Sequence, residues 1–513
     1  MASVRDNNKR IMKNTFMLYI RMFFIMSVSL FTSRVILKTL GVEDFGTYNV
    51  VGGFVTMFSA FSGMFTGAIS RYLTYELGRN SDDSGNRLNK IFSTSVTIQL
   101  FLAFACAIIV EVAGIWFINN KLVIPADRLV AANWVLHCSV LTFIINLISV
   151  PYNAAIIAHE RMSAFAYISV FEVTMKLLIV YALYISPVDK LITYSVLLAL
   201  LAFVVRLIYG TYCSRHFEEC HYKLIFDSQL IKSMSGFAGW NFLGSGTYML
   251  NTQGLNMLIN MFFGVTLNAA RGIANQVDGA IMQFVNNFLT AVKPQITKNI
   301  AAGNMDYVVS LVCKGAKFGY FLMLLFVIPI FLESEQILHY WLGIVPQYTV
   351  VFVRLAMIAS MVDLLGTTIT TAVIATGKVK MYYIIIGTTG LLVLPMTYVA
   401  FRLGLSPVSA YISFITVYVF LLYLKLLRIK RLVDFPIKQY VNKVVLKIFP
   451  VTIMASLIPA TVYFLMPQSL FRLIVLAIVS IISTFTFIYF IGMNGNERKF
   501  VSSIIKEKVH KNN

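Results

Sequence analysis

Charged residues are unusually rare in this sequence. Only 12% of its 513 residues are Asp, Glu, Lys or Arg, against roughly 25% in soluble domains. Hydrophobic residues make up 58% of the chain, and its mean hydropathy is +0.78. So few charges cannot cover a soluble surface, which excludes an ordinary soluble enzyme. We therefore expect a polytopic membrane protein.

Acidic residues are scarcer than basic ones: 22 Asp and Glu stand against 42 Lys and Arg, a formal net charge of +20. In a membrane protein such an excess usually lies in cytoplasmic loops beside anionic lipid. The basic residues gather at 5–13, 71–90, 425–447 and 498–511, and they do not alternate with aromatic residues in the way that would form a platform for stacking on bases. We expect membrane lipids as partners and no nucleic acid.

Cysteine is also sparse, and its five positions follow no framework spacing that would indicate a disulfide scaffold. The series Cys213, His216, Cys220 and His221 does not have the usual spacing of a structural zinc site, so no metal is expected. A phosphate-binding Gly-x-x-x-x-Gly-Lys-Ser/Thr loop, a nucleophile elbow and a His-Glu-x-x-His motif are missing. We expect no catalytic residues, no cofactor and no direct use of ATP.

Long apolar runs are what the sequence does contain. A membrane-spanning helix needs about twenty apolar residues, and fourteen stretches qualify. The first seven are 14–37, 46–70, 91–116, 129–158, 164–185, 191–212 and 235–262. The second seven are 265–292, 309–331, 350–376, 379–400, 409–424, 448–465 and 473–493. The fold class predicted is an all-α membrane protein.

Most basic residues fall on one side when alternate loops are assigned to opposite sides, so the positive-inside rule places both termini in the cytoplasm. The predicted organisation is a cytoplasmic N-terminus (1–13), a first lobe of six helices (14–212) and a linker (213–234). A second lobe of six helices (235–428), a linker (429–447), two further helices (448–493) and a cytoplasmic tail (494–513) follow.

The two lobes are predicted to be repeats. Residues 41–74 match 264–297 after a shift of 223 residues, with identities at Gly41/Gly264, Val42/Val265, Phe61/Phe284, Phe65/Phe288, Ala68/Ala291 and Thr74/Thr297. The shift covers six predicted helices. Because six is an even number of membrane crossings, the second lobe has the same orientation in the membrane as the first. Parallel repeats of this kind place a binding site between the two halves.

Polar side chains inside the predicted helices are the candidate binding residues. An Arg at the centre of a bilayer costs about 2.5–3.5 kcal/mol unless it faces water or a partner. Arg21 and Arg271 each belong to a polar stripe on an apolar helix, and Arg271 shares its face with Asn275 and Asp278. The seventh span adds amides at Asn251, Gln253, Asn256 and Asn260.

Two interpretations of these residues stay open. Guanidinium and amide groups in a hydrated cavity suit an amphiphile that carries phosphate and sugar. The same groups also join membrane helices to one another by hydrogen bonds.

Three further charged residues are candidates for coupling to H⁺ or Na⁺. Glu172 and Lys176 are four residues apart and can form an ion pair on one turn, which is either structural or involved in coupling. Asp363 is an isolated carboxylate within the tenth span, for which the sequence offers no partner.

Two blocks resemble a known family. Residues 14–55, NTFMLYIRMFFIMSVSLFTSRVILKTLGVEDFGTYNVVGGFV, resemble the opening of bacterial Wzx-type polysaccharide-unit flippases. Residues 267–301, LNAARGIANQVDGAIMQFVNNFLTAVKPQITKNIA, resemble their eighth helix. These flippases belong to the multidrug/oligosaccharidyl-lipid/polysaccharide (MOP) exporter superfamily.

The resemblance implies two six-helix lobes in a V, as in the MATE-like fold, around a cationic cavity that opens alternately to each side of the bacterial inner membrane. The implied substrate is an undecaprenyl-diphosphate-linked oligosaccharide for O-antigen, capsule or exopolysaccharide assembly. A polysaccharide polymerase and a chain-length regulator are the implied protein partners.

Other transport functions rank lower. Drug antiporters of the superfamily typically carry a carboxylate in the first or seventh helix, and this chain has neither, so cation-coupled drug export is the second candidate. Peptidoglycan-precursor flippases tend to have more arginines in their first two helices. That function, or a membrane glycan polymerase, is third.

Overall fold

The computed structural model is helical throughout the part of the chain that it describes. It describes residues 4–58, 62, 65–66, 69–70, 72–73, 76–77, 84–159, 161–225, 227–301, 303–378 and 380–499. Side chains are described from residue 22 onward, except at a few positions within the helices. The residues divide into two compact units. Unit 1 comprises residues 1–272, 341–347 and 391–410, and unit 2 the rest.

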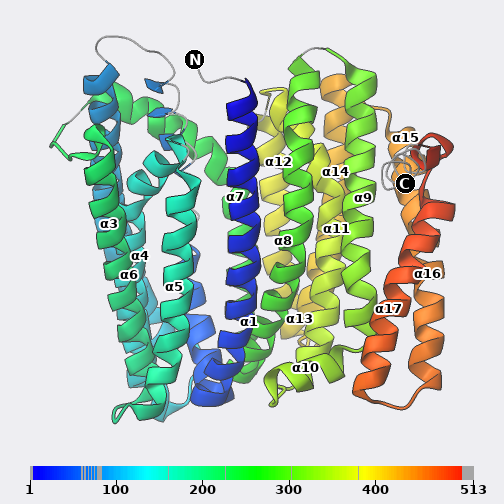
Figure 1. Cartoon of the computed structure of the whole chain (residues 1–513). Helices are drawn as coiled ribbons and strands as arrows, with labels where there is room; N and C mark the ends of the chain where they lie inside the picture. Colours follow the sequence, from blue (N-terminus) through cyan, green and yellow to red (C-terminus); the bar gives the residue numbers. More distant parts are fainter. Residues whose placement is uncertain are drawn as a thin grey trace. The chain divides into compact units, whose positions relative to one another are not determined.

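Within the described residues, unit 1 contains the long helices that precede α8, which are labelled in Figure 1. They are α1 (Val4–Thr56), α3 (Ser84–Asn120), α4 (Leu129–Ala158), α5 (Met162–Ala182), α6 (Lys190–His216) and α7 (Ser228–Phe263). The start of α8 (Val265–Ala301) and the short α13 (Val393–Arg402) also belong to it.

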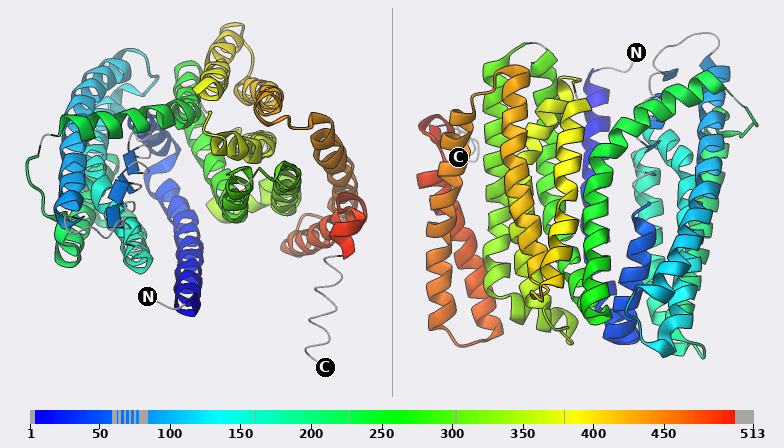
Figure 2. Two further views of the ribbon diagram at one scale, coloured as in Figure 1. Left: turned by 90° about the horizontal axis from the view of Figure 1, so that it is seen from above. Right: turned by 180° about the vertical axis from the view of Figure 1, so that it is seen from behind.

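The core of unit 1 is built from small and branched side chains. Helix α4 packs on α3 and α6, and α1 packs on α4 and α5 (Figure 2). Val50 and Val51 of α1, Ala103 of α3, and Ala132 and Val135 of α4 are buried in one cluster. Because lipid is as apolar as these side chains, close packing rather than exclusion of water holds the helices together.

A kink in α1 replaces the loop expected between the first two spans. The helix turns at Gly41, where φ is 82° and ψ is 176°. Gly264 ends α7 with nearly the same conformation, φ 82° and ψ −176°. This region of backbone conformation is essentially restricted to glycine. The predicted repeat pair Gly41/Gly264 therefore makes the same turn at the same place in each half.

The segments that follow these two glycines meet inside unit 1. A Cβ atom on Gly46 would lie 2.0 Å from the carbonyl oxygen of Val265, so the two backbones touch where only glycine fits. Gly272 in turn lies against the side chain of Asn49. Asn49 and Gly272 are equivalent under the 223-residue shift, so the repeats contact each other at matching positions.

Unit 2 holds the remaining helices. They are most of α8, α9 (Met305–Leu332), α10 (Ser334–Leu342), α11 (Thr349–Ala375), α12 (Lys380–Leu391), α14 (Ser409–Val433), α15 (Ile437–Tyr440), α16 (Leu446–Leu465) and α17 (Leu470–Phe487). π-Helical turns at Val441–Val445 and Ile488–Gly492 precede α16 and follow α17.

Helix α9 organises unit 2, since it packs on α11, α16 and α17. Phe326 of α9 stacks on Phe284 of α8, with ring centroids 5.1 Å apart. Helices α16 and α17 form a hairpin (Figure 1). Within it the Ser483 hydroxyl donates to the carbonyl oxygen of Ala455 at 2.9 Å. The Tyr320 hydroxyl and the Thr452 hydroxyl, 3.2 Å apart, join α9 to this hairpin.

The predicted all-α architecture is confirmed, and the helices generally run past the predicted spans at their polar ends. Helix α14, for example, continues from the predicted end at residue 424 to Val433. Helix α10 lies in a segment for which no helix was predicted, and a one-residue break at Leu392 divides the eleventh span into α12 and α13. The end of the second span, beyond residue 58, lies largely outside the described residues.

We predict that Gly41→Ala and Gly264→Ala each destabilise the protein, because a side chain in this backbone region costs about 1–3 kcal/mol. The thermal unfolding midpoint of purified protein should fall in both variants. Gly236→Ala is the control, because Gly236 is helical with open space around it. An unchanged midpoint in both Gly41→Ala and Gly264→Ala would contradict the required turn.

Candidate functional site

Helices α7 and α8 stand apart from the other long helices by their polarity. Eleven helical segments of the described chain contain an 18-residue window apolar enough for a membrane span. Helices α7 and α8, with 36 and 37 residues, are long enough but are not among the eleven. We call this pair, joined at Gly264, the polar hairpin.

Arg271 links the two helices of the polar hairpin. Its side chain is only 3% exposed. Its Nε donates to Oδ1 of Asn256 at 2.6 Å, and its Nη2 donates to the carbonyl oxygen of Thr252 at 3.2 Å. Such charge-assisted hydrogen bonds offset the cost of removing a guanidinium group from water.

The amides of α7 continue this network. Nδ2 of Asn256 donates to Oε1 of Gln253 at 2.7 Å, and its backbone carbonyl oxygen accepts from Nδ2 of Asn268 at 2.7 Å. The side chains of Gln253, Asn256, Asn268 and Arg271 are thus connected by hydrogen bonds that link α7 to α8. In the observed state these residues join helices, which is the second of the two interpretations that the sequence left open.

Two predicted amides lie elsewhere on α7. Asn251 is fully buried. Asn260, also buried, accepts a hydrogen bond from the backbone N–H of Val123 at 2.9 Å and so fastens α7 to the segment after α3. The predicted binding residues of α7 therefore do not form a single set, because Asn260 acts at the end of the helix.

The other cationic candidate, Arg21, has a side chain that lies outside the described residues. Asn275 and Asp278 continue from Arg271 along α8 and are partly buried. Asp278 accepts a hydrogen bond from the Ser360 hydroxyl of α11 at 2.7 Å. In the observed state its polar contact is thus to α11.

A second polar cluster in unit 2 gives Asp363 the partner that the sequence did not reveal. Asp363 follows Ser360 by three residues on α11 and therefore shares its face. Its Oδ1 lies 3.5 Å from Nζ of Lys425, a buried residue of α14. Asp278, Ser360, Asp363 and Lys425 thus come from three helices and contain two carboxylates with one ammonium group. Such a group can exchange a proton or bind a monovalent cation.

Glu172 and Lys176 form the predicted ion pair on α5, with Nζ 2.6 Å from Oε1. Their side chains are 36% and 44% exposed. Both border a cavity of about 240 Å³ inside unit 1, which Ser139, Thr142 and Asn146 of α4 also line. The pair therefore borders a cavity with room for water, whose lining is largely apolar apart from these polar groups.

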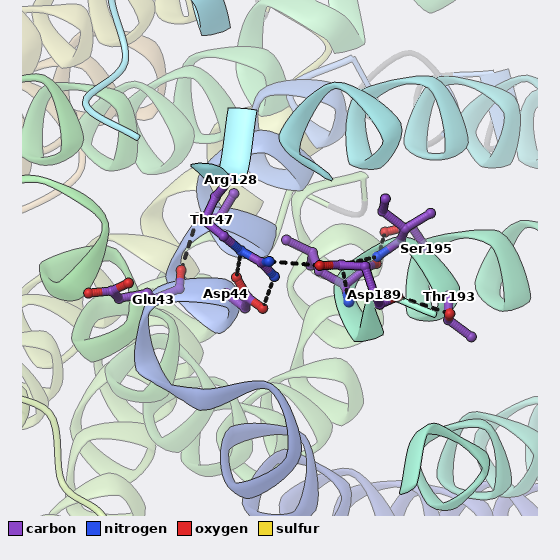
Figure 3. Close-up of polar contacts among 9 residues, drawn as sticks. Glu43, Asp44, Thr47, Arg128, Asp189, Thr193 and Ser195 are labelled. Atoms are coloured by element: carbon purple, nitrogen blue, oxygen red, sulfur yellow. Dashed lines mark hydrogen bonds and ion pairs between the residues drawn. The ribbon is translucent and has the colours of Figure 1, made fainter. Parts of the chain in front are cut away.

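An ion-pair network missed at the sequence level joins the region just after the kink in α1 to the starts of α4 and α6 in unit 1 (Figure 3). Arg128, just before α4, donates from Nε to Oδ1 of Asp44 at 2.7 Å, and its Nη2 contacts Oδ2 of the same carboxylate. Its Nη1 donates to Oδ2 of Asp189 at 2.7 Å. Asp189 also caps α6 by accepting from the N–H groups of Leu191 and Ile192.

The cavity begins close to this network, because Tyr48, which lines it, follows Asp44 by four residues on α1. One signal could have indicated the network, because an Asp directly before an apolar run is a typical N-cap. Its pairing with Arg128, 61 residues away, has no sequence signature. The contact holds the starts of α4 and α6 against α1 just after its kink.

Solved structures with the same arrangement of helices are transporters. A structure described as the lipid II flippase MurJ in an inward closed conformation is 14% identical, with a TM-score of 0.68, over 91% of this chain and 97% of that one. An inward-facing multidrug resistance MATE family transporter of the MOP superfamily is 10% identical, with a TM-score of 0.64, over 80% and 94%. An outward-facing MATE transporter is 12% identical, with a TM-score of 0.58, over 82% and 96%.

The chain is therefore an integral membrane protein with the fold of the MOP superfamily, which confirms the predicted fold class. The family model described as polysaccharide biosynthesis protein matches residues 11–300, and the chain belongs to this family. No curated protein matches the sequence.

We predict that Arg128→Ala lowers the free energy of unfolding by about 2–3 kcal/mol. Removing one partner of a fully buried ion pair costs about 3–5 kcal/mol, and this arginine is 21% exposed. The loss should appear as a lower thermal unfolding midpoint. Lys190→Ala is the matched control, because Lys190 is exposed beside Asp189. Equal midpoints for the two variants would contradict a structural role for the network.

Proposed function

We propose that the protein is a flippase that moves undecaprenyl-diphosphate-linked oligosaccharide units across the bacterial inner membrane for the assembly of a surface polysaccharide. The observation that carries this proposal is the polar hairpin, which places a buried arginine and several amides in two long helices that, over their described residues, are less apolar than the other spans. Membership of the polysaccharide biosynthesis family and the MurJ-like fold support it. The termini are proposed to be cytoplasmic.

In this proposal the substrate is recognised in two parts. Arg271 and Arg21 hold the diphosphate, since a guanidinium group binds phosphate oxygens bidentately. The amides of Asn251, Gln253, Asn256, Asn260 and Asn275, with the Asp278 carboxylate, contact sugar hydroxyls. The polyprenyl chain stays in lipid, so only the polar end needs a hydrated path.

Binding at Arg271 requires an exchange of partners. Its guanidinium group is engaged by Asn256 and Thr252 in the observed state, and a diphosphate would replace these neutral acceptors with charged ones. A diphosphate adds Coulomb attraction to the guanidinium group that the neutral amide and carbonyl acceptors do not supply. The substrate would therefore favour a state in which the hairpin is rearranged, which is how a ligand drives alternating access.

The proposal makes the protein a secondary transporter rather than an enzyme.

Cation-coupled drug export is the second candidate, since MATE transporters share the fold. It is disfavoured because α7 carries no carboxylate between Ser228 and Phe263. Efflux of dyes driven by a pH gradient, without movement of lipid-linked sugar, would favour the second candidate.

We predict that Arg271→Ala reduces delivery of lipid-linked units by about ten- to a hundredfold, the equivalent of about 1.5–3 kcal/mol for a hydrogen bond to a charged group. Arg21→Ala should have a similar effect, and Arg271→Lys an intermediate one. The measurement is complementation of a flippase-null strain, together with translocation of an undecaprenyl-diphosphate-linked sugar by purified protein in vesicles.

Arg354→Ala is the matched control. Arg354 is also an arginine within a span, and its Nε donates to the carbonyl oxygen of Phe331 at 2.9 Å. This variant should keep transport even if its stability falls. Membrane abundance and unfolding midpoint are measured for every variant, so a folding defect is separated from lost transport. Full complementation by both Arg21→Ala and Arg271→Ala would contradict the assignment of the diphosphate site.

The energy source is proposed to be an H⁺ or Na⁺ gradient, with Asp363 or the Glu172–Lys176 pair as the coupling groups. We predict that Asp363→Asn makes transport in vesicles insensitive to an imposed ion gradient, since the amide can neither release a proton nor carry charge. Glu172→Gln is tested in parallel. Asp306→Asn, an exposed carboxylate at the start of α9, is the control. A full gradient response in both test variants would exclude coupling at these residues.

A further inference from the structure

A cavity in unit 2 lies outside the residues used so far. It has a volume of about 600 Å³ and lies where α9 begins, where the π-helical turn leads into α16, and where the turn after α17 ends. Its polar lining consists of Ser310, Lys314, Lys317, Lys443, Asn494, Asn496 and Glu497. We call it the basic pocket.

One lysine and the single carboxylate of the basic pocket satisfy each other. Lys317 is 2% exposed, and its Nζ donates to Oε2 of Glu497 at 2.7 Å and to the carbonyl oxygen of Gly492 at 3.0 Å. The same carboxylate oxygen accepts from the backbone N–H of Asn494 at 2.8 Å. This buried set fixes the turn after α17 to α9 and forms the floor of the pocket.

The other lysines leave a positive surplus. Lys314 is exposed, and no described residue pairs with it. Lys443 is exposed, and among the described residues it donates to the neutral Oε1 of Gln439 at 3.1 Å. Lys447, one turn after Lys443, donates to the carbonyl oxygen of Ile491 at 3.1 Å. Three lysines against one carboxylate line the pocket itself, so it attracts an anion.

Exposed apolar side chains continue from the basic pocket along the outside of the α16–α17 hairpin. Leu446 and Phe449 of α16 are 60% and 69% exposed, and Phe490 after α17 is 62% exposed. Leu446 lies three residues after Lys443, and Phe490 lies three residues before Met493, which lines the pocket. In both segments, the path from the pocket-lining residue to the exposed apolar residue leads toward the membrane-spanning part of the helix. A ligand with phosphate in the pocket could therefore extend acyl chains over these side chains.

We propose that the basic pocket binds the phosphate headgroup of an anionic glycerophospholipid in the leaflet that we assign to the cytoplasm. Ammonium groups of Lys314 and Lys443 would hold the phosphate, and the Asn494 and Asn496 amides would contact the glycerol part of the headgroup. Basic pockets between transmembrane helices on this side of a membrane suit such headgroups. The bound lipid would anchor the hairpin of α16 and α17 that follows the two repeats.

The test uses the full chain purified in neutral detergent. The thermal unfolding midpoint is measured while phosphatidylglycerol is added, with phosphatidylcholine as the uncharged comparison. The double variant Lys314→Gln/Lys443→Gln should weaken the apparent affinity for phosphatidylglycerol about tenfold, the loss expected from about 1.4 kcal/mol. Lys317 is left in place because its buried contacts are needed for folding.

The control is Lys430→Gln/Lys438→Gln, which removes two exposed lysines from the same end of the protein, in α14 and α15. It should bind phosphatidylglycerol as the unmodified chain does. Equal weakening in both double variants would overturn the proposal, because it would indicate an effect of overall charge.

Two further measurements distinguish a bound phospholipid from other ligands that carry phosphate. Inorganic phosphate at the same concentration should leave the midpoint unchanged, and an equal shift would mean that a free anion is bound instead. Undecaprenyl diphosphate should not displace phosphatidylglycerol from the pocket. Displacement that the Lys314→Gln/Lys443→Gln variant abolishes would identify a substrate-docking site and overturn the phospholipid assignment. None of these outcomes depends on the proposed transport function.

Discussion

A charged group inside a membrane protein must find its partners within the protein, and this constraint governs how polar residues are placed in this chain. Arg271 meets it through Asn256 and the carbonyl oxygen of Thr252, Lys425 through Asp363, and Lys317 through Glu497 and Gly492. Each contact joins helices that the apolar pattern alone would leave free to slide. The polar residues thus determine which helices are neighbours.

The repeats share a backbone but differ in side-chain chemistry. Gly41 and Gly264 make the same turn, and the residue seven positions later is Tyr48 in the first repeat and Arg271 in the second. Tyr48 packs edge-on against Tyr194 of α6, with ring centroids 5.1 Å apart, and lines the cavity of unit 1. One position in a duplicated hairpin thus carries an aromatic ring in one half and a cation in the other. The two halves of a symmetric scaffold therefore differ in polarity at equivalent positions.

The sequence was sufficient to predict the helical architecture and the pair of equivalent glycines, because span length and the repeat offset are local properties of the chain. It also identified Arg271 and the α7 amides as unusual. It could not predict that Asn256 would be the partner of Arg271, or that Lys425 would reach Asp363. Those contacts depend on how helices are rotated about their axes, which periodicity does not fix when a helix is apolar on all sides. Helix α10 was missed because its nine residues lie below the length of a span.

The polarity of α7 and α8 has a consequence for how the protein is made. A nascent helix enters the bilayer from the translocon according to its own hydrophobicity, and a central arginine or aspartate opposes that step. Helix α7 precedes α8 by only the single residue Gly264. The first contacts that Arg271 can form are therefore with the helix synthesised immediately before it. The two are expected to leave the translocon together, already joined, before the rest of the second half has been translated.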